Sequence, residues 1–212
     1  MSQAQASWYE RHVLPYLIDL ACGMPAVEKQ RRAVVPLASG QVLEIGIGTG
    51  RNLRYYDASK VQRLYGLDPA LQWHPIAQRR LAKTGLRVEP LALSAEAIPL
   101  EDHSVDTVVC TYTLCTIPDP AKALGEFRRV LKPGGQLLFS EHGLAPDASV
   151  ANWQRRLEPY WKPLAGGCHL TRAVPELLND AGFEIENIDR RYLKGPRPLT
   201  WNSRGLARVK AT

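Results

Sequence analysis

The chain alternates between short apolar runs and segments in which apolar residues recur with a helical period. The runs predict buried strands, and the helical periods predict helices between them. Strands are expected near residues 41–46, 62–67, 86–92, 105–112 and 136–142, and helices near 51–56, 70–84 and 120–131. Strands that alternate with helices at this spacing favour a parallel sheet covered by helices on both faces.

The two ends of the chain differ from this middle part. Residues 7–36 contain two helical patterns, so residues 1–40 are expected to form a helical flank or lid. The last third predicts a helix near 149–162 and another that Thr171 caps and that runs to Asp180. Two closing strands, at 183–185 and 199–209, are expected to form an antiparallel hairpin at the sheet edge. The whole chain, residues 1–212, is expected to be a single domain.

The stretch VLEIGIGTG, residues 42–50, has glycine at every second position after a short apolar run. Gly46, Gly48 and Gly50 let the backbone adopt positive φ and bring bare main chain against a ligand. The residues that follow are expected to open a helix whose first N–H groups point at the same place. This turn therefore predicts a ligand site at the end of the first strand.

A dinucleotide is the first ligand to consider at such a turn, but two residues argue against it. The dinucleotide fingerprint requires a third glycine where this chain has Arg51. Glu44, expected at the mouth of the turn, would repel a pyrophosphate and attract a cationic ligand. S-adenosylmethionine carries a sulfonium and an ammonium group and no phosphate. Asp68 follows the turn by about twenty positions, where an acidic residue binds ribose hydroxyls, so S-adenosylmethionine is the predicted cofactor.

Composition places few limits on this prediction. Of the residues, 45% are hydrophobic and 23% are charged, and the net charge is +6. The arginines occur as scattered pairs such as Arg31-Arg32, which usually mark the solvated face of a helix, so nucleic acid is not the expected partner. No apolar run is long enough to span a bilayer, and the N-terminus lacks the pattern of a signal peptide, so a cytoplasmic protein is expected.

The four cysteines are Cys22, Cys110, Cys115 and Cys168. They form no CxxC pair and show no zinc-like spacing with a histidine. Reduced thiols and no metal site are therefore expected. Cys115 and Cys168 are interpreted as small buried residues rather than as nucleophiles.

Four motifs together resemble those of the class I S-adenosylmethionine-dependent methyltransferases. They are VLEIGIGTG (42–50), GLDPA (66–70), LSAEAIPLEDHSVDTVVC (93–110) and LKPGGQLLFSEHG (131–143). The resemblance implies an α/β, Rossmann-like fold with a seven-stranded, mostly parallel sheet and helices on both faces. It divides the domain into a cofactor-binding half, residues 41–145, and acceptor-side helices with the closing hairpin, residues 146–212.

A narrower likeness points to one subgroup. CTYTLC (110–115), Glu141-His142 and GCHLTR (167–172) look like the subgroup that contains the methyltransferase-like thiol S-methyltransferases. The sequence does not contain the N-terminal membrane anchor of that subgroup's animal members, so a soluble, bacterial-type relative is expected.

The resemblance also implies roles for the glycine turn and for the residues after the second strand. The three glycines of the turn would lie beneath the methionine moiety and the ribose, with Glu44 near the ammonium group. Asp68 would accept hydrogen bonds from both ribose hydroxyls, and Pro69 would pack beside the adenine.

Later strand ends would complete the cofactor site. Ser94 stands where the family often has an aspartate that binds the adenine amino group, so adenine recognition is expected to rely on the backbone of Ala95. Thr111 and Tyr112 would face the methionine carboxylate and the transferred methyl group.

Methyl transfer from a sulfonium is an in-line displacement, so the protein mainly aligns acceptor and methyl group and excludes water. A base is needed only if the acceptor arrives protonated. His142, at the carboxyl end of the fifth strand, is the candidate base, although a histidine there can equally satisfy a loop carbonyl.

Other side chains near the expected acceptor end have two interpretations. His169 is expected at the surface, and Tyr112 either orients the acceptor or belongs to the core. Trp153 and Trp161 are expected in the core rather than around a pocket.

These features favour an enzyme that methylates a small, apolar acceptor, with a thiol preferred because of the subgroup likeness. A lipid, a quinone or another small molecule is an alternative acceptor. A noncatalytic, regulatory S-adenosylmethionine binder is a further alternative, since the glycines and Asp68 only hold cofactor. An RNA methyltransferase is suggested by the basic charge and opposed by its scattered distribution. The sequence predicts no oligomeric state.

Overall fold

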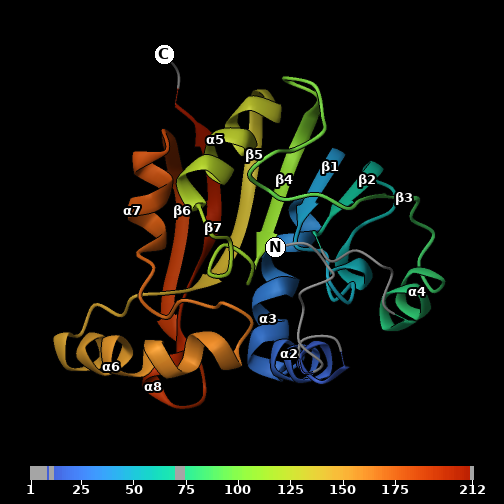
Figure 1. Ribbon diagram of the computed structural model, residues 1–212. Helices are drawn as coiled ribbons and strands as arrows, with labels where there is room; N and C mark the ends of the chain where they lie inside the picture. The colour runs from blue at the N-terminus through green and yellow to red at the C-terminus, as the bar shows by residue number, and fades with distance from the viewer. Residues whose placement is uncertain (1–8, 10–11, 70–74, 211–212) are drawn as a thin grey trace.

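A computed structural model describes residues 9, 12–69 and 75–210 and places seven strands in one sheet, in the order β3-β2-β1-β4-β5-β7-β6 (Figure 1). The strands are β1 Gly40–Ile45, β2 Val61–Leu67, β3 Val88–Leu91, β4 Val105–Thr111, β5 Leu131–His142, β6 Phe183–Tyr192 and β7 Trp201–Val209. The pairs among β1 to β5 are parallel, and β7 runs antiparallel to both β5 and β6. The predicted fold class and closing hairpin are confirmed, with β6 at the sheet edge.

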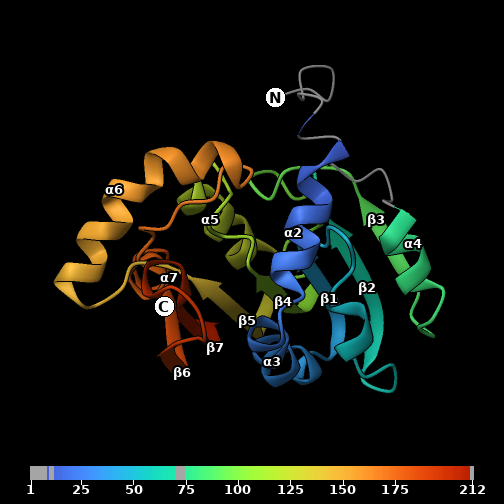
Figure 2. The same cartoon turned by 90° about the horizontal axis from the view of Figure 1, so that it is seen from below.

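Helices cover both faces of this sheet. They are α2 Leu14–Cys22, α3 Pro25–Val34, α4 Pro75–Leu81, α5 Pro120–Val130, α6 Ala148–Leu164, α7 Val174–Asp180 and α8 Arg197–Thr200, with short 3₁₀ turns η2 Val35–Leu37 and η3 Leu53–Tyr55. α5 and α7 pack on one face and α3 on the other, while α2 and α6 lie at the end where the parallel strands finish (Figures 1 and 2).

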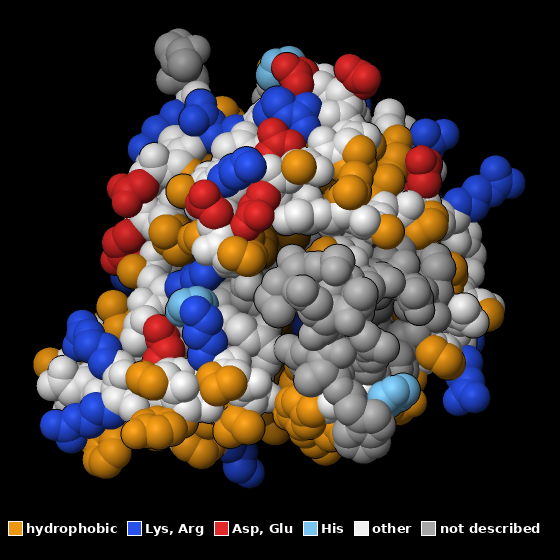
Figure 3. All heavy atoms as spheres, in the orientation of Figure 1, with side chains coloured by type: hydrophobic (Ala, Val, Ile, Leu, Met, Phe, Trp, Pro, Cys, Tyr) orange, Lys and Arg blue, Asp and Glu red, His pale blue; other side chains and the backbone are white. Residues whose placement is uncertain are grey.

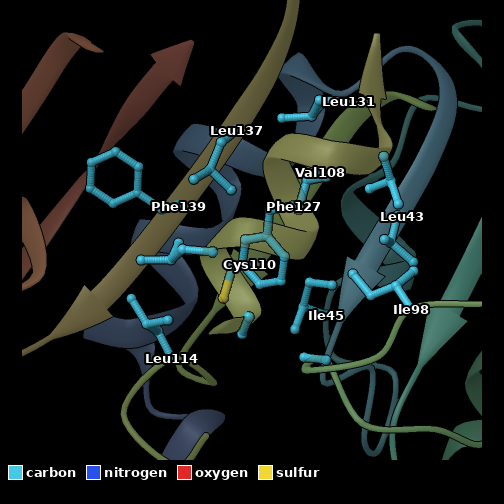
Figure 4. Close-up of a cluster of buried hydrophobic side chains, with 14 of the residues drawn as sticks. Leu43, Ile45, Ile98, Val108, Cys110, Leu114, Phe127, Leu131, Leu137 and Phe139 are labelled. Carbon is cyan, nitrogen blue, oxygen red and sulfur yellow. The ribbon is translucent and has the colours of Figure 1, made fainter. Parts of the chain in front are cut away.

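The two-residue period of the strands divides the core between the faces. Leu43 and Ile45 of β1 point toward α5 and pack with Phe127, which is fully buried (Figure 4). Val42, which precedes Leu43 and points to the opposite face, joins a second apolar cluster on the α3 face with Val34. Successive side chains of a strand point to opposite faces, so Glu44 belongs to the α3 face. This assignment decides where its carboxylate lies in the site.

Local sequence signals explain the limits of α5. Asp119 caps the helix by accepting a hydrogen bond from the Lys122 N–H at 3.0 Å, and Pro120 occupies the first turn. The helix ends at Val130, and β5 begins at Leu131 instead of near residue 136 as predicted. A register shift in the β4–β5 pairing accommodates these extra residues.

Three other predicted boundaries need correction. The helix expected at 51–56 is only the short turn η3, and the helix expected at 70–84 is α4, residues 70–74 lying outside the described part. Thr171 does not cap α7, because its N–H and hydroxyl donate to Glu158 at 2.8 and 2.7 Å and the helix starts three residues later. The expected lid region contains α2 and α3, and residues 1–8 and 10–11 are outside the described part.

One face of α6 is apolar and exposed. Trp153 is 55% exposed and Tyr160 75%, and with Leu157 and Leu164 they recur at intervals of three and four residues. Hydrophobic side chains accordingly line the lower edge of the molecule over α6 (Figure 3). Trp153 is therefore not a core residue as predicted, because the buried side of α6 is formed by small and polar residues, namely Val150, Ala151 and Gln154.

Replacing Gly205 tests the insertion of β7 between its neighbours. A Cβ atom at this position would lie 2.0 Å from the Asn187 carbonyl oxygen and 3.0 Å from the Phe139 ring. We expect Gly205→Ala to lower the free energy of unfolding by about 2 kcal/mol or more, since the strands must move apart. Urea denaturation measures the change.

Gly125→Ala is the matched control for this substitution. Gly125 lies in α5, and an added Cβ there meets no atom within 4 Å. Alanine should raise the free energy of unfolding by up to about 1 kcal/mol because it favours the helix. Wild-type stability in the Gly205 variant would show that β7 does not pack as described.

Candidate functional site

A pocket of about 170 Å³ opens at the carboxyl ends of β1 and β2. It brings together predicted cofactor residues from three segments: Gly46, Asp68, Pro69, Ser94 and Ala95. The loop after β4 completes its wall with Thr113, Thr116, Ile117 and Pro118. A larger hollow of about 290 Å³ lies at the amino ends of β2 and β3 and contains none of the predicted residues. The carboxyl edge is where open parallel sheets bind ligands.

The glycine turn lies in close contact with the segments that follow β2 and β4. Gly46, Gly48 and Gly50 all have positive φ. The Gly48 N–H donates to Asp68 Oδ2 at 3.0 Å, which joins the turn to the end of β2. A side chain at Gly46 would collide with Thr113, whose hydroxyl would lie 2.3 Å from the new Cβ. Glycine is therefore required at this point by the close approach of the β4 loop.

The segment after β3 forms a tight turn at the far end of the pocket. The Ser94 hydroxyl accepts the Glu96 N–H at 3.2 Å, and Glu96 in turn accepts the Asp119 N–H at 2.7 Å. Ala95 is buried between them. These contacts fix the backbone that is expected to face an adenine ring.

The expected position of Glu44 at the mouth of the turn needs correction. Its carboxylate is buried on the α3 face, where it accepts hydrogen bonds from Asn52 Nδ2 at 3.0 Å and from the Tyr56 hydroxyl at 2.8 Å. Burial raises the pKa of Glu44 to about 7, and the hydrogen bond from Tyr56 and the nearby Arg31 guanidinium lower it less. Glu44 thus organises polar groups behind the pocket instead of forming its rim.

Arg31 is the main residue of this cluster that sequence reasoning missed. Its side chain is not solvated, since the residue is only 5% exposed. Its Nη1 donates to Thr111 Oγ1 at 2.5 Å and to Asn52 Oδ1 at 2.8 Å, and Nε is buried without a partner in the described chain. The spacing of Arg31 from Val27 and Val34 places it on the buried stripe of α3, and this signal could have identified it.

Tyr112 sits at a strained point directly after β4. Its φ is 54°, and its N–H donates to the Ser140 carbonyl at 2.9 Å. The Arg31 guanidinium lies 5.1 Å from the centre of its ring, and its hydroxyl accepts the Asn202 amide at 3.0 Å. Burial raises the pKa of the phenol. Neither residue belongs to the lining of the 170 Å³ pocket: Tyr112 is half-buried beside it and Thr111 is buried.

His142 lies at the end of β5 and contacts a cysteine. Its Nε2 is 3.1 Å from Cys168 Sγ, and the indole N–H of Trp161 donates to the same sulfur at 3.2 Å. Burial alone lowers the pKa of His142, but the Cys168 sulfur and the Glu141 carboxylate outweigh burial and raise it. Hydrogen bonds with Cys115 and His142 lower the pKa of the Cys168 thiol. Burial acts in the opposite direction but has the smaller effect.

Cys115 completes this group, and its ligand atom lies within 4.8 Å of those of His142 and Cys168. The spacing of cysteines and histidines along the chain does not reveal this cluster, because its three residues belong to separate segments that only the sheet brings together. His169 is half-buried beside it, and its ring Nδ1 donates to Glu158 Oε1, 3.2 Å away.

Comparison with known proteins defines the class. The methyltransferase domain family matches residues 43–139. The human protein thiol S-methyltransferase TMT1B is 39% identical over 170 residues, which is 77% of this chain and 67% of that protein. A demethylmenaquinone methyltransferase of Clavibacter sepedonicus is 33% identical over 134 residues, covering 63% of this chain and 53% of its own. The chain thus spans about two thirds or less of the length of these relatives.

Solved structures agree with the fold. A Thermotoga maritima S-adenosylmethionine-dependent methyltransferase, described as a possible histamine N-methyltransferase, matches with a TM-score of 0.63 and 23% identity, covering 93% of this chain and 96% of that one. The chain therefore belongs to the class I S-adenosylmethionine-dependent methyltransferases, and S-adenosylmethionine is its cofactor. None of the helices in the described residues is long and apolar enough to cross a membrane.

The buried state of Glu44 predicts a pH-dependent stability. With a folded pKa of about 7 against about 4.3 in an unfolded chain, the folded chain binds the proton more tightly. This contribution to the free energy of unfolding is fully present below about pH 4 and is lost as the pH rises through about 7.

Glu44→Gln should remove that dependence because the amide does not titrate. Between about pH 4 and about pH 8, the wild-type free energy of unfolding should fall by up to about 3 kcal/mol more than that of the variant. Denaturant titrations of both proteins across this range measure the difference. Parallel curves for the two proteins would contradict the prediction.

Proposed function

We propose that this chain transfers the methyl group of S-adenosylmethionine to the sulfur atom of a small, apolar thiol. The observation that carries the proposal is the position of Cys115, His142 and Cys168 next to the loop that lines the pocket, since Thr113 and Thr116 flank Cys115. An acceptor in that place would meet the cofactor at the carboxyl ends of β4 and β5. The resemblance to a thiol S-methyltransferase supports sulfur as the methylated atom.

The adenosine part of the cofactor is assigned to the described pocket. Asp68 accepts hydrogen bonds from the ribose hydroxyls, and Pro69 packs beside the adenine. The backbone of Ala95, with the Ser94 hydroxyl, binds the adenine amino group. The glycine turn lies beneath the ribose and the methionine moiety because its backbone carries no side chains there.

The methionine end is assigned to the buried polar cluster. The unpartnered Nε of Arg31 makes this guanidinium a suitable partner for the cofactor carboxylate, and Thr111 orients it. Glu44 supports this end from behind the pocket, because its carboxylate holds Asn52 in place. This assignment keeps the predicted residues and adds Arg31 to them.

At the acceptor end, Tyr112 orients the thiol and His142 promotes loss of its proton. A free thiol has a pKa of about 8.5 and is partly ionised at neutral pH, so modest assistance is sufficient. The thiolate lone pair then attacks the methyl carbon in line with the departing sulfur. Alignment and exclusion of water supply the remaining rate enhancement.

A quinone-derived acceptor is the second candidate. It is favoured by the 33% identity to the demethylmenaquinone methyltransferase. Such an acceptor is also apolar and would need the same open end of the pocket. The methylated atom then would be carbon, and activation of a thiol would have no role.

An acceptor panel separates these candidates. Purified protein and labelled S-adenosylmethionine are incubated with alkyl thiols, phenols, amines, phospholipids, a demethylated quinol or RNA, and release of S-adenosylhomocysteine is measured. We expect turnover with the alkyl thiols. Turnover confined to the quinol or to RNA would reject the thiol proposal, and cofactor binding without turnover on any acceptor would favour a regulatory binder.

Asp68→Asn tests the cofactor assignment. The neutral amide cannot accept charge-assisted hydrogen bonds from both ribose hydroxyls, so the Kd for S-adenosylmethionine should rise at least about tenfold. Isothermal titration calorimetry measures it. Asp57→Asn, an exposed carboxylate bonded to Ser59, is the matched control and should leave the Kd unchanged. Equal affinities in all three proteins would remove Asp68 from the site.

His142→Ala tests the acceptor end. We expect kcat with a thiol to fall about 100-fold while the Kd for S-adenosylmethionine stays within about twofold of wild type. His103→Ala, at the amino end of β4, is the control and should keep wild-type turnover. Unchanged turnover in the His142 variant would exclude this residue from the mechanism.

A further inference from the structure

Cys115, His142 and Cys168 form a compact group of metal-ligand side chains. Their ligand atoms lie within 4.8 Å of one another, with 3.1 Å between His142 Nε2 and Cys168 Sγ. Cys115 follows β4, His142 ends β5, and Cys168 lies in the loop between α6 and α7. The two cysteines are 2% and 7% exposed. Three segments of the chain therefore place two sulfur atoms and one imidazole nitrogen close together.

The loop that carries Cys115 is held rigidly. The buried Glu141 carboxylate accepts the N–H groups of Thr113 at 2.9 Å and Leu114 at 3.0 Å. The Cys115 carbonyl accepts the His169 N–H at 3.0 Å, and the Arg172 guanidinium donates to the carbonyl of Ile117 at 2.6 Å. Little conformational freedom remains to be lost when a ligand binds, and this favours affinity.

The donor set fits a zinc ion. Zn²⁺ takes cysteine sulfur at about 2.3 Å and histidine nitrogen at about 2.1 Å in a tetrahedron, so its ligand atoms lie about 3.6 Å apart. That value falls inside the range of separations in this cluster, which needs only small shifts to meet it. Two thiolates also neutralise the ion, which suits a buried position. The indole N–H of Trp161 is a donor to Cys168 Sγ of the kind that supports metal-bound sulfur.

We propose that Cys115, His142 and Cys168 bind one Zn²⁺ ion, and that the fourth coordination position takes the sulfur of the acceptor thiol. Three protein ligands and one open position are the arrangement of catalytic zinc sites. The second half of this inference rests on the proposed function. The zinc site itself rests only on the geometry of the three residues.

The metal changes the role of His142. As a ligand, it cannot also accept the proton of the acceptor, so ionisation is promoted by the ion instead of by a base. The thiol binds Zn²⁺ and releases its proton to water. Its sulfur lone pair forms the new bond to the methyl carbon, and the bond to the cofactor sulfur breaks with its electron pair staying on that sulfur. The products are a neutral methyl thioether, which is a weaker ligand than the thiolate, and neutral S-adenosylhomocysteine.

Metal analysis of the purified protein is the first test. The full chain is prepared with a non-thiol reductant, loaded with Zn²⁺, freed of excess metal and analysed by plasma mass spectrometry. We expect about one zinc per wild-type chain and at least about a tenfold lower content in Cys115→Ser, His142→Ala and Cys168→Ser. Cys22→Ser, a cysteine outside the cluster, is the matched control and should keep its zinc. Circular dichroism and S-adenosylmethionine affinity check that each variant is folded.

Cobalt substitution is the second test, because it reports the ligands directly. Wild-type protein loaded with Co²⁺ should show sulfur-to-cobalt charge-transfer absorption and intense tetrahedral d–d bands. A small alkyl thiol should increase the charge-transfer absorption as it adds a third sulfur. Both signals should be absent from Cys168→Ser and present in Cys22→Ser.

The outcomes distinguish this inference from the proposed function. Metal-free protein that methylates thiols at the wild-type rate, or wild-type protein that retains no metal and yields no cobalt spectrum, would overturn the zinc site and leave thiol methylation standing, with His142 as base. A cobalt spectrum that responds to thiol, in a protein that methylates no thiol, would overturn the proposed function and leave the zinc site standing. A cobalt spectrum unaffected by thiol would overturn the open position.

Discussion

Parallel pairing of β1, β4 and β5 is the constraint on which the functional part of the molecule depends. Because Ile45 pairs with Cys110 and Thr111 with Ser140, the three strands finish at nearly the same level. The glycine turn, the Tyr112 loop and His142 therefore emerge side by side from one edge. A single buried carboxylate, Glu141, then fixes the loop after β4 through two backbone N–H groups. Strand register thus sets the relative positions of the glycine turn, the Tyr112 loop and His142.

Sequence reasoning located the strands and turns that depend on short-range signals. The apolar runs located the strands, and a hydrogen bond joins the glycine turn to Asp68, the two features predicted to bind one cofactor. It placed Glu44 wrongly, because a residue inside a strand is assigned to a face by its two-residue period and not by its closeness to the turn. The two-residue period of β4 likewise places Thr111 on the α3 face of the sheet, where it contacts Arg31.

Tertiary contacts account for what local signals did not predict. Thr171 has the side chain of a helix cap, yet Glu158 from α6 engages both its donors and the helix begins later. The cluster of Cys115, His142 and Cys168 has no signature in chain spacing, since its members are brought together by the sheet and by the loop after α6. Such groupings become visible only when the strand order is known.

The place of β7 has a consequence for how the chain reaches its native state. β6 precedes β7 in the sequence, yet it joins the sheet only through β7, which lies between it and β5. During synthesis, the backbone donors and acceptors along the open side of β5 must stay unpaired until residues 201–209 leave the ribosome. Strand contacts that close late in this way slow folding and leave an exposed edge in the interim. The nascent polypeptide therefore presents the open edge of β5 for aggregation until β7 is made.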